Sequence, residues 1–229
     1  MEEKKFVGFK KEELGVKEYI KKELGKGRIS TVSIEYTPVG EKIIVSTSKP
    51  GLVIGRRGEK IDELTRVLKK MFKLDNPHIE IHEILNPTLD AQLVADEIAL
   101  LLERKGSLQF KVVAYKMLEM IMKSGALGAE IVLSGKLPSE RARSWRFAQG
   151  FLKKTGDPAK VVDRAMAQAI TLPGVIGIKI SILPPNAHIH DKIVIDDALR
   201  KRLFDHILEE IKPVIEEPKK KKTTRRKAK

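Results

Sequence analysis

The stretch KPGLVIGRRGEKIDEL, Lys49–Leu64, holds two adjacent arginines between Gly55 and Gly58, directly after an apolar run. Apolar residues recur every three or four positions behind the second glycine, which predicts a helix that begins there. A glycine-hinged turn at a helix start brings backbone N–H groups and the positive end of the helix close to a phosphate. Arg56 and Arg57 add positive charge, and each guanidinium group can bind two phosphate oxygens at once. The stretch therefore predicts an anion-binding turn, with an ordinary basic turn as the alternative.

The glycine spacing distinguishes between the anions that such a turn could bind. Three residues separate Gly51 from Gly55 and two separate Gly55 from Gly58, whereas a dinucleotide-binding turn requires one and then two. The stretch also lacks the Gly-Lys-Ser/Thr ending of a Walker loop. These differences favour a nucleic-acid backbone over a nucleotide, and we expect no cofactor.

The composition limits the class of protein. The 229 residues are 41% hydrophobic, which is enough for one large core or two small ones. The chain has no cysteine, which excludes disulfides, thiol catalysis and cysteine zinc sites. No apolar run approaches the roughly 18 residues of a membrane-spanning helix, and the first residues are too charged for a signal peptide. We expect a soluble cytoplasmic protein without membrane contact.

The net charge of +14 is unevenly distributed. Residues 219–229 hold eight basic residues and no acidic one, which leaves 37 basic against 31 acidic residues in 1–218. Residues 49–73 hold eight bases to three acids, and residues 136–154 hold six bases to one acid. Two basic patches and a basic tail favour a polyanionic partner, because each neutralised phosphate releases counterions. The alternative for either patch is a solvated surface.

The first half of the chain has the pattern of a small α+β fold. We expect an amphipathic helix over 11–25, alternating strands over 28–38, 41–48 and 78–84, and a helix from the glycine turn to Phe72. This order resembles the type II KH fold, in which a G-x-x-G loop clamps a single-stranded nucleic-acid backbone. The matching RNA-binding residues are Gly55, Arg56, Arg57 and Gly58, with Lys60 behind them.

The second half predicts another α+β domain. We expect helices over 90–107, 109–125 and 157–170, and strands over 128–137, 144–154 and 175–184. Asp157 is the expected cap of the third helix, with Pro158 at its first position. The predicted organisation is a type II KH domain with its N-terminal and linking helices (1–106), an α+β domain with a small mixed sheet (107–185), and an extended segment, acidic and then basic, with a disordered tail (186–229).

Catalytic and metal-binding patterns are missing from the sequence. His78 and His82 lie four residues apart, but their segment alternates as a strand, which would separate them by about 13 Å. No serine–histidine arrangement or histidine–glutamate helix motif stands out, and the adjacent acids Asp196 and Asp197 lie in the acidic extension, where we expect them to be solvated. We therefore expect no catalytic residues and no metal site, and we predict that the protein is not an enzyme.

The chain as a whole resembles the family of the third protein of the small ribosomal subunit, in its archaeal and eukaryotic form, over nearly all of residues 5–185. The resemblance rests on GLVIGRRGEKI, DAQLVADEIALLLERK, GALGAEIVLSGKL, RARSWRFAQGFLKKTGDP and GVIGIKISILP. The second-domain segments are the more diagnostic, because KH loops occur in many proteins. The resemblance implies a structural protein of the subunit head that binds small-subunit ribosomal RNA (rRNA) and helps to form the entrance of the messenger RNA (mRNA) channel.

The resemblance also implies particular contact residues. In the second domain, rRNA contacts are expected from Lys136, Arg141, Arg143, Ser144 and Arg146. Stacking of Trp145 on a base is an alternative to packing in the core, which is the more common place for a lone tryptophan in a strand. Family members commonly carry two adjacent bases at the mRNA entrance, where this chain reads QFKVV. Only Lys111 matches that pair, and Lys116 follows a turn and a half later. The implied partners are rRNA, mRNA and neighbouring ribosomal proteins of the head.

Two other functions remain open at this point. Some eukaryotic relatives are linked to DNA-damage incision, so an enzyme acting on nucleic acid is one alternative. A free-standing KH protein that regulates mRNA is the other, although it would not need the second-domain segments.

Overall fold

The computed structural model describes residues 2–38, 40–72, 74, 76–189 and 200–204. The described residues as far as His188 form one compact unit. The expected acidic extension and basic tail lie largely outside the described residues. No helix in the described ranges is long and apolar enough to cross a membrane.

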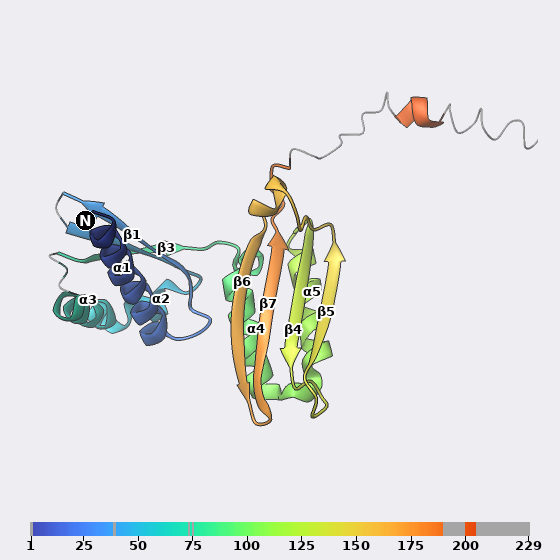
Figure 1. The fold of residues 1–229 in the computed structure, drawn as a ribbon, viewed down its shortest axis with the longest axis horizontal. Coiled ribbons are helices and arrows are strands. Elements are labelled where there is room, and N and C mark those ends of the chain that lie inside the picture. Colours follow the sequence, from blue (N-terminus) through green and yellow to red (C-terminus); the bar gives the residue numbers. More distant parts are fainter. Residues whose placement is uncertain (1, 39, 73, 75, 190–199, 205–229) are drawn as a thin grey trace, which may run out of the picture. The chain divides into compact units, whose positions relative to one another are not determined.

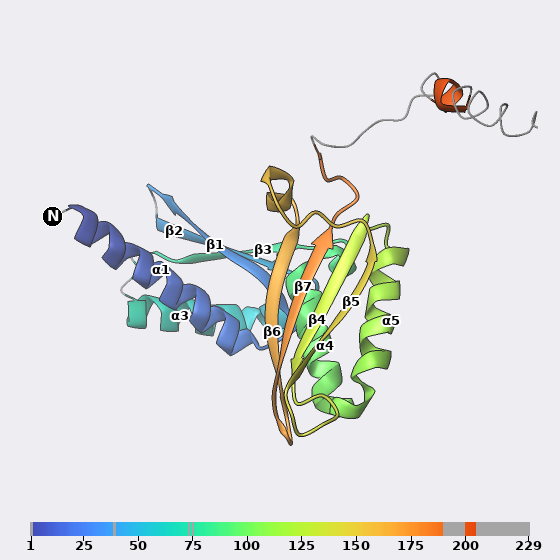
Figure 2. The same cartoon turned by 45° about the vertical axis from the view of Figure 1, so that its right-hand side comes forward.

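The first fold consists of three helices and three strands. Its elements are α1 (Glu2–Leu24), β1 (Ile29–Thr37), β2 (Gly40–Thr47), α2 (Pro50–Ile54), α3 (Glu59–Phe72) and β3 (His78–Glu83). The sheet order is β1-β2-β3, with β2 antiparallel to β1 and parallel to β3. Helices α1 and α3 lie on the same side of this sheet (Figure 2). This order of elements confirms the type II KH fold.

Alternation along the strands builds the first core. Ile43 and Val45 of β2 are buried, and their neighbours in register, Ile34 and Val32 on β1, lie on the same side of the sheet. They pack against the apolar stripes of the two longer helices, including Ile20 and Leu68, which are fully buried. Apolar residues that recur every 3.6 positions along the helices and every second position along the strands thus form one cluster.

The second fold is a helical pair on a four-stranded sheet. Its elements are α4 (Ala91–Lys105), α5 (Phe110–Lys123), β4 (Gly128–Gly135), β5 (Arg143–Gly150), β6 (Asp163–Thr171) and β7 (Gly174–Leu183). The strand order is β5-β4-β7-β6, and every neighbouring pair is antiparallel. The expected mixed sheet is therefore an antiparallel one. Both helices cover one face of the sheet, and the other face is open (Figure 1).

The segment 157–170 is not the helix that we expected. Asp157–Lys160 forms a single 3-10 turn, and the remainder is strand β6. Ala165 and Ala169 alternate along this strand and are buried against the helices. Alanine favours a helix locally, but pairing with β7 along the whole strand and burial of alternate residues outweigh that preference.

Helix α4 begins and ends at strong capping positions. The Asp90 carboxylate accepts hydrogen bonds from the N–H groups of Gln92 and Leu93 at 2.9 and 3.0 Å, and Gly106 ends the helix with a positive φ of 80°. The buried residues of α4 belong to the same apolar cluster as the second sheet. We therefore propose that the boundary between the two folds lies between β3 and α4, earlier than the Gly106 boundary expected from the sequence.

Candidate nucleic-acid interface

The G-x-x-G turn is a tight loop between two helices. The N–H of Gly55 donates to the carbonyl of Gly51 at 3.1 Å and ends α2. Gly55, Arg57 and Gly58 have φ values of 75°, 54° and 83°, all in the left-handed region. A Cβ on Gly55 would lie 2.8 Å from Cγ of Lys60, so the lysine stem lies directly over the glycine. The turn needs glycine both for its backbone conformation and for this close approach.

The basic side chains of the turn are available to a ligand. Arg56, Arg57 and Lys60 are all exposed, and none of them has an ion-pair partner among the described residues. Of the apolar run before the turn, Val53 is buried in the core, while Leu52 remains exposed. The turn therefore presents unpaired positive charge beside apolar surface, as a clamp on a phosphate backbone with adjacent bases requires.

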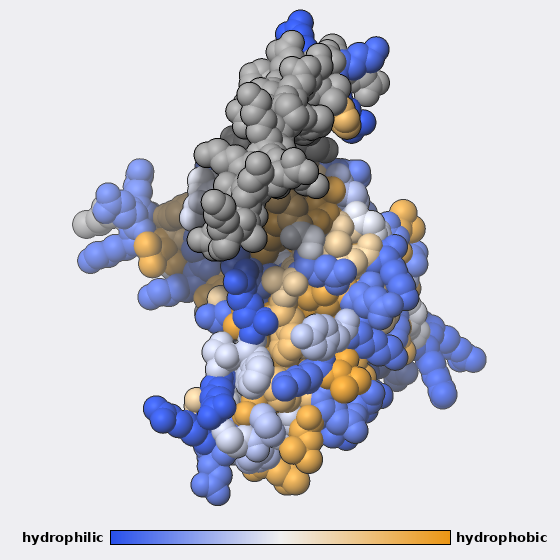
Figure 3. All heavy atoms as spheres, turned by 90° about the vertical axis from the view of Figure 1, so that its right-hand side faces the viewer, coloured by the Kyte–Doolittle hydropathy of each residue, from blue (hydrophilic) through white to orange (hydrophobic). Residues whose placement is uncertain are grey.

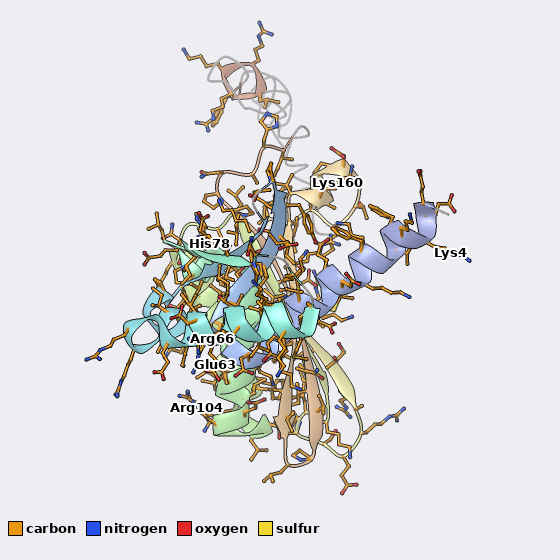
Figure 4. The ribbon with its side chains drawn as sticks, turned by 90° about the vertical axis from the view of Figure 1, so that its left-hand side faces the viewer. Lys4, Glu63, Arg66, His78, Arg104 and Lys160 are labelled. Atoms are coloured by element: carbon orange, nitrogen blue, oxygen red, sulfur yellow. The ribbon has the colours of Figure 1, made fainter. Side chains whose placement is uncertain are left out.

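Helix α3 continues this surface with acidic side chains in its first half and basic ones in its second half. Figure 4 shows Glu63 and Arg66 projecting from α3, and both are exposed. Arg66, Lys69 and Lys70 are exposed further along the helix, so unpaired positive charge extends from the turn along α3. The expected KH-loop residues thus come together at one end of α3.

Strand β5 divides the expected second-domain residues between two faces. It is an outer strand of the sheet, and Trp145 and Phe147 lie opposite Leu133 and Ile131, whose side chains are fully buried. Arg143 is two residues from Trp145 and so lies on the same, helix-covered face. Ser144 and Arg146 lie on the open face. The sequence prediction treated these residues as one group, but the structure separates them.

Lys111 lies on the helix-covered side, next to an aromatic cluster. Its Nζ is 4.6 Å from the centroid of the Trp145 ring, which in turn is 5.6 Å from the Phe110 ring. Trp145 therefore packs against Phe110 and forms a cation–π contact with Lys111. Lys116 is exposed, but it lies five residues from Lys111 and so on a different face of α5. Figure 3 shows exposed apolar side chains among hydrophilic ones on the side that carries β5 and α5.

On the open face, one carboxylate holds two bases. Glu130 of β4 is largely buried and is bonded to Arg146 and, at 2.7 Å, to Lys154. Burial alone would raise the pKa of Glu130, but the hydrogen bonds and charges of Lys154 and Arg146 outweigh it and hold this pKa below its usual value. Glu130 thus stays ionised and fixes the positions of both bases.

The structure adds residues that the sequence reasoning missed. Lys154 is brought to Arg146 by Glu130, and Lys179 of β7 lies on the same open face, two strands away from Arg146. The composition of the basic patch 136–154 pointed toward Lys154, but no local signal pointed to Lys179. Lys136 and Arg141 are exposed in the loop between β4 and β5, without an ion-pair partner in the described part of the chain.

A type II KH fold and a second α+β fold with bases around one outer strand define a protein of the KH class that binds nucleic acid. Within the described residues, no three His, Asp or Glu side chains lie close enough together to hold a metal ion. The candidate interface consists of exposed basic side chains on the KH turn and around β5.

Comparison with known proteins gives the same assignment. The KH domain family matches residues 15–89, and the family described as "Ribosomal protein S3, C-terminal domain" matches residues 98–182. Small ribosomal subunit protein uS3 of Methanocaldococcus jannaschii is 42% identical over 92% of this chain and 99% of its own length. The protein of the same name from Methanocorpusculum labreanum is 36% identical over 84% of this chain and 83% of its own length. The chain therefore belongs to the ribosomal protein S3 family of the small subunit.

Proposed function

We propose that this protein is a structural, non-catalytic component of the small-subunit head that binds rRNA mainly through its second fold. Membership in the family makes it a small-subunit ribosomal protein with an RNA-binding KH domain, and the proposal concerns where the RNA lies. The observation that carries it is the set of bases around β5. Lys136, Arg141 and Arg143 are unpaired among the described residues, and Glu130 holds Arg146 and Lys154 in place.

The KH turn has a different proposed role. Arg56, Arg57 and Lys60 contact the backbone of a single-stranded RNA near the mRNA entrance. Lys111 supplies one base to that entrance, and its contact with Trp145 limits its reach. Because Lys116 lies on another face of α5, we expect Lys111→Ala, and not Lys116→Ala, to slow translation through a stable mRNA hairpin. Equal rates for the two variants would contradict this role.

The rRNA proposal is tested by removing bases that have no structural partner. We expect the double change Arg141→Ala and Arg143→Ala to make the salt dependence of rRNA binding shallower, by about 0.7 to 0.9 in logarithmic slope for each phosphate that is no longer neutralised. The measurement is the affinity for small-subunit rRNA over a range of salt concentrations. Arg146 is left intact, because its removal would deprive the largely buried Glu130 of one of its two bases.

A matched control removes the same charge elsewhere. Lys4 and Lys5 are exposed near the start of α1, where Figure 4 shows Lys4, and neither has an ion-pair partner in the described ranges. Lys4→Ala with Lys5→Ala should leave the slope unchanged. A similar slope for both double variants, whether reduced or not, would contradict a specific rRNA contact at β5.

A further inference from the structure

Four aromatic rings are in contact with one another where α5 packs beside β5 (Figure 2). Phe110 lies between Trp145 and Phe147, with ring centroids 5.6 and 6.3 Å away. Phe147 in turn contacts Tyr115 at 5.1 Å. Aromatic residues make up only 5% of the chain, so this group is a local concentration of rings.

Tyr115 is the exposed end of this aromatic group. Phe110 and Phe147 are 1% and 6% exposed, whereas Tyr115 is 62% exposed. The planes of the Tyr115 and Phe147 rings are inclined by 76°, so the edge of one ring meets the face of the other. Contact with a buried ring restricts the orientation of Tyr115. An exposed ring that is already oriented suits the stacking of a nucleobase, because little conformational entropy is lost on binding.

Lys111 places a positive charge beside the exposed ring. It lies four residues before Tyr115 on α5, a spacing that makes side chains neighbours on a helix surface, with Cβ atoms about 5 to 6 Å apart. Its Nζ lies 4.6 Å from the Trp145 ring centroid, and no carboxylate pairs with it in the described ranges. The ring covers one side of the ammonium group, which has three donors. The other donors are available to a phosphate whose neighbouring base reaches Tyr115.

Trp145 combines a structural cost with a specific advantage. Its Nε1 is buried and has no hydrogen-bond partner among the described residues. A phenylalanine would avoid this unsatisfied donor. What the indole offers in exchange is its ring face, because tryptophan is the best aromatic partner for a cation. The cost is therefore explained if Trp145 holds Lys111 in place.

The charges around this site favour RNA as its ligand. Arg143 is exposed two residues before Trp145 on the same face, and it has no ion-pair partner in the described part of the chain. Glu119, one turn beyond Tyr115, is already paired with Lys123 at 2.7 Å. The site thus offers two unpaired cations and an exposed aromatic ring, the combination by which proteins bind a single-stranded nucleic acid.

We propose that Lys111 and Tyr115 form a subsite for one nucleotide of single-stranded mRNA, with the phosphate on the lysine and the base stacked on the tyrosine. Trp145 is the positioning residue that holds Lys111 there through its ring face. Stacking uses the face of a base and none of its edges, so the subsite accepts all four bases. This inference deepens the proposed role of Lys111 at the mRNA entrance and rests on it.

An abasic nucleotide in the mRNA tests the stacking. Small subunits that carry the full chain are titrated with an unstructured mRNA that has one abasic nucleotide, placed at successive positions on the entrance side. For wild type, one position should weaken binding by about fivefold or more, as expected for the loss of one stacked base. The same abasic nucleotide should have no further effect with Tyr115→Leu, and Tyr115→Phe should restore the wild-type penalty. The absence of any penalty in wild type, or an unchanged penalty with Tyr115→Leu, would overturn the subsite.

Phe6→Leu is the matched control. Phe6 is 63% exposed on α1, and Nζ of Lys10, four residues later, lies 5.9 Å from its ring centroid. Lys10 is already paired with Glu13 at 2.6 Å, so Phe6→Leu should leave the abasic penalty unchanged. Mass spectrometry of the Tyr115→Leu subunits should find every protein of the wild-type subunit. Loss of one of them would show that Tyr115 binds a protein, and it would equally overturn the subsite.

A double-mutant cycle with Lys111 tests the positioning role of Trp145. Trp145→Leu should weaken mRNA binding by about two- to fivefold, as expected for the loss of a cation–π contact. It should have no further effect in a chain that already carries Lys111→Ala. Trp145→Phe keeps a ring in the aromatic group and should weaken binding less. An equal loss from Trp145→Leu with and without Lys111 would show that Trp145 acts through packing alone.

This inference and the proposed function fail separately. Equal translation rates of Lys111→Ala and Lys116→Ala through a hairpin would refute the entrance role, whereas the abasic penalty is measured on unstructured mRNA and needs no unwinding. An abasic penalty that persists in Tyr115→Leu removes the subsite and leaves a hairpin effect of Lys111 intact. The salt dependence at Arg141 and Arg143 concerns rRNA and affects neither result.

Discussion

Arg57 has a strained backbone at the point of proposed RNA contact. It is the only non-glycine residue with positive φ in the described part of the chain, and left-handed backbone costs an ordinary residue about 1 to 2 kcal/mol. Asparagine tolerates this conformation better. We expect Arg57→Asn to preserve the free energy of unfolding or raise it by about 0.5 to 1 kcal/mol, while weakening RNA binding. Denaturant unfolding and RNA titration measure the two effects, and a fall in both stability and affinity would contradict this explanation.

The two glycines of the turn differ in what surrounds them. Gly55 combines positive φ with the close approach of Lys60, whereas nothing lies within 4 Å of a Cβ on Gly58. Gly58→Ala should cost only the backbone strain, about 1 to 2 kcal/mol of unfolding free energy. Gly55→Ala should cost more and should also displace Lys60. Thermal unfolding of both variants provides the measurement, and equal losses would show that the lysine stem moves away freely.

At the scale of elements, β4 and β5 are coupled by the Glu130 ion pairs. The pKa of Glu130 is held below its usual value of 4.5, so the carboxylate stabilises the fold at pH values above its unfolded pKa. That stabilisation is lost as the pH falls through the lower pKa of the folded state. Glu130→Gln should therefore lower the unfolding free energy at pH 7 by about 1 to 3 kcal/mol, and the difference from wild type should shrink in acid.

The measurement is unfolding by urea between about pH 7 and pH 2.5, a range that spans the titration of a carboxylate. Glu119→Gln is a suitable control, because Glu119 forms an exposed ion pair with Lys123 on α5. Its removal should have little effect at any pH, as is usual for exposed pairs. A difference between wild type and Glu130→Gln that stays constant over the whole pH range would rule out a contribution from ionisation.

At the scale of the whole molecule, the described residues as far as His188 contain two separate apolar clusters. One is built from α1, α3 and the first sheet, and the other from α4, α5 and the second sheet, with no residue in common. Leu68→Ala should lower the stability of the first cluster by about 2 to 5 kcal/mol. Hydrogen exchange should accelerate in β2 and β3 and change little in β4 and β7. The reverse pattern is expected for Ile178→Ala, and equal acceleration in both sheets would indicate a single cooperative core.

The sequence predicted the elements whose signals are local. The order of elements and the G-x-x-G turn indicated the KH fold, because glycine spacing and apolar periodicity belong to neighbouring residues. The Arg56–Arg57 pair was predicted for the same reason. Segment 157–170 was predicted wrongly, because its alanines favour a helix when their pairing with β7 is unknown.

The amino-acid sequence by itself determined the KH turn, the basic character of the second fold and the family. Only the tertiary structure decided that Arg143 and Arg146 lie on opposite faces of β5, that Glu130 fixes Arg146 and Lys154, and that α4 packs with the second sheet. The physical reason is that the spacing of apolar residues and the conformation of a turn depend on residues close together in the sequence. Burial, ion pairing and strand order are set by residues far apart in the chain, whose meeting depends on the whole fold.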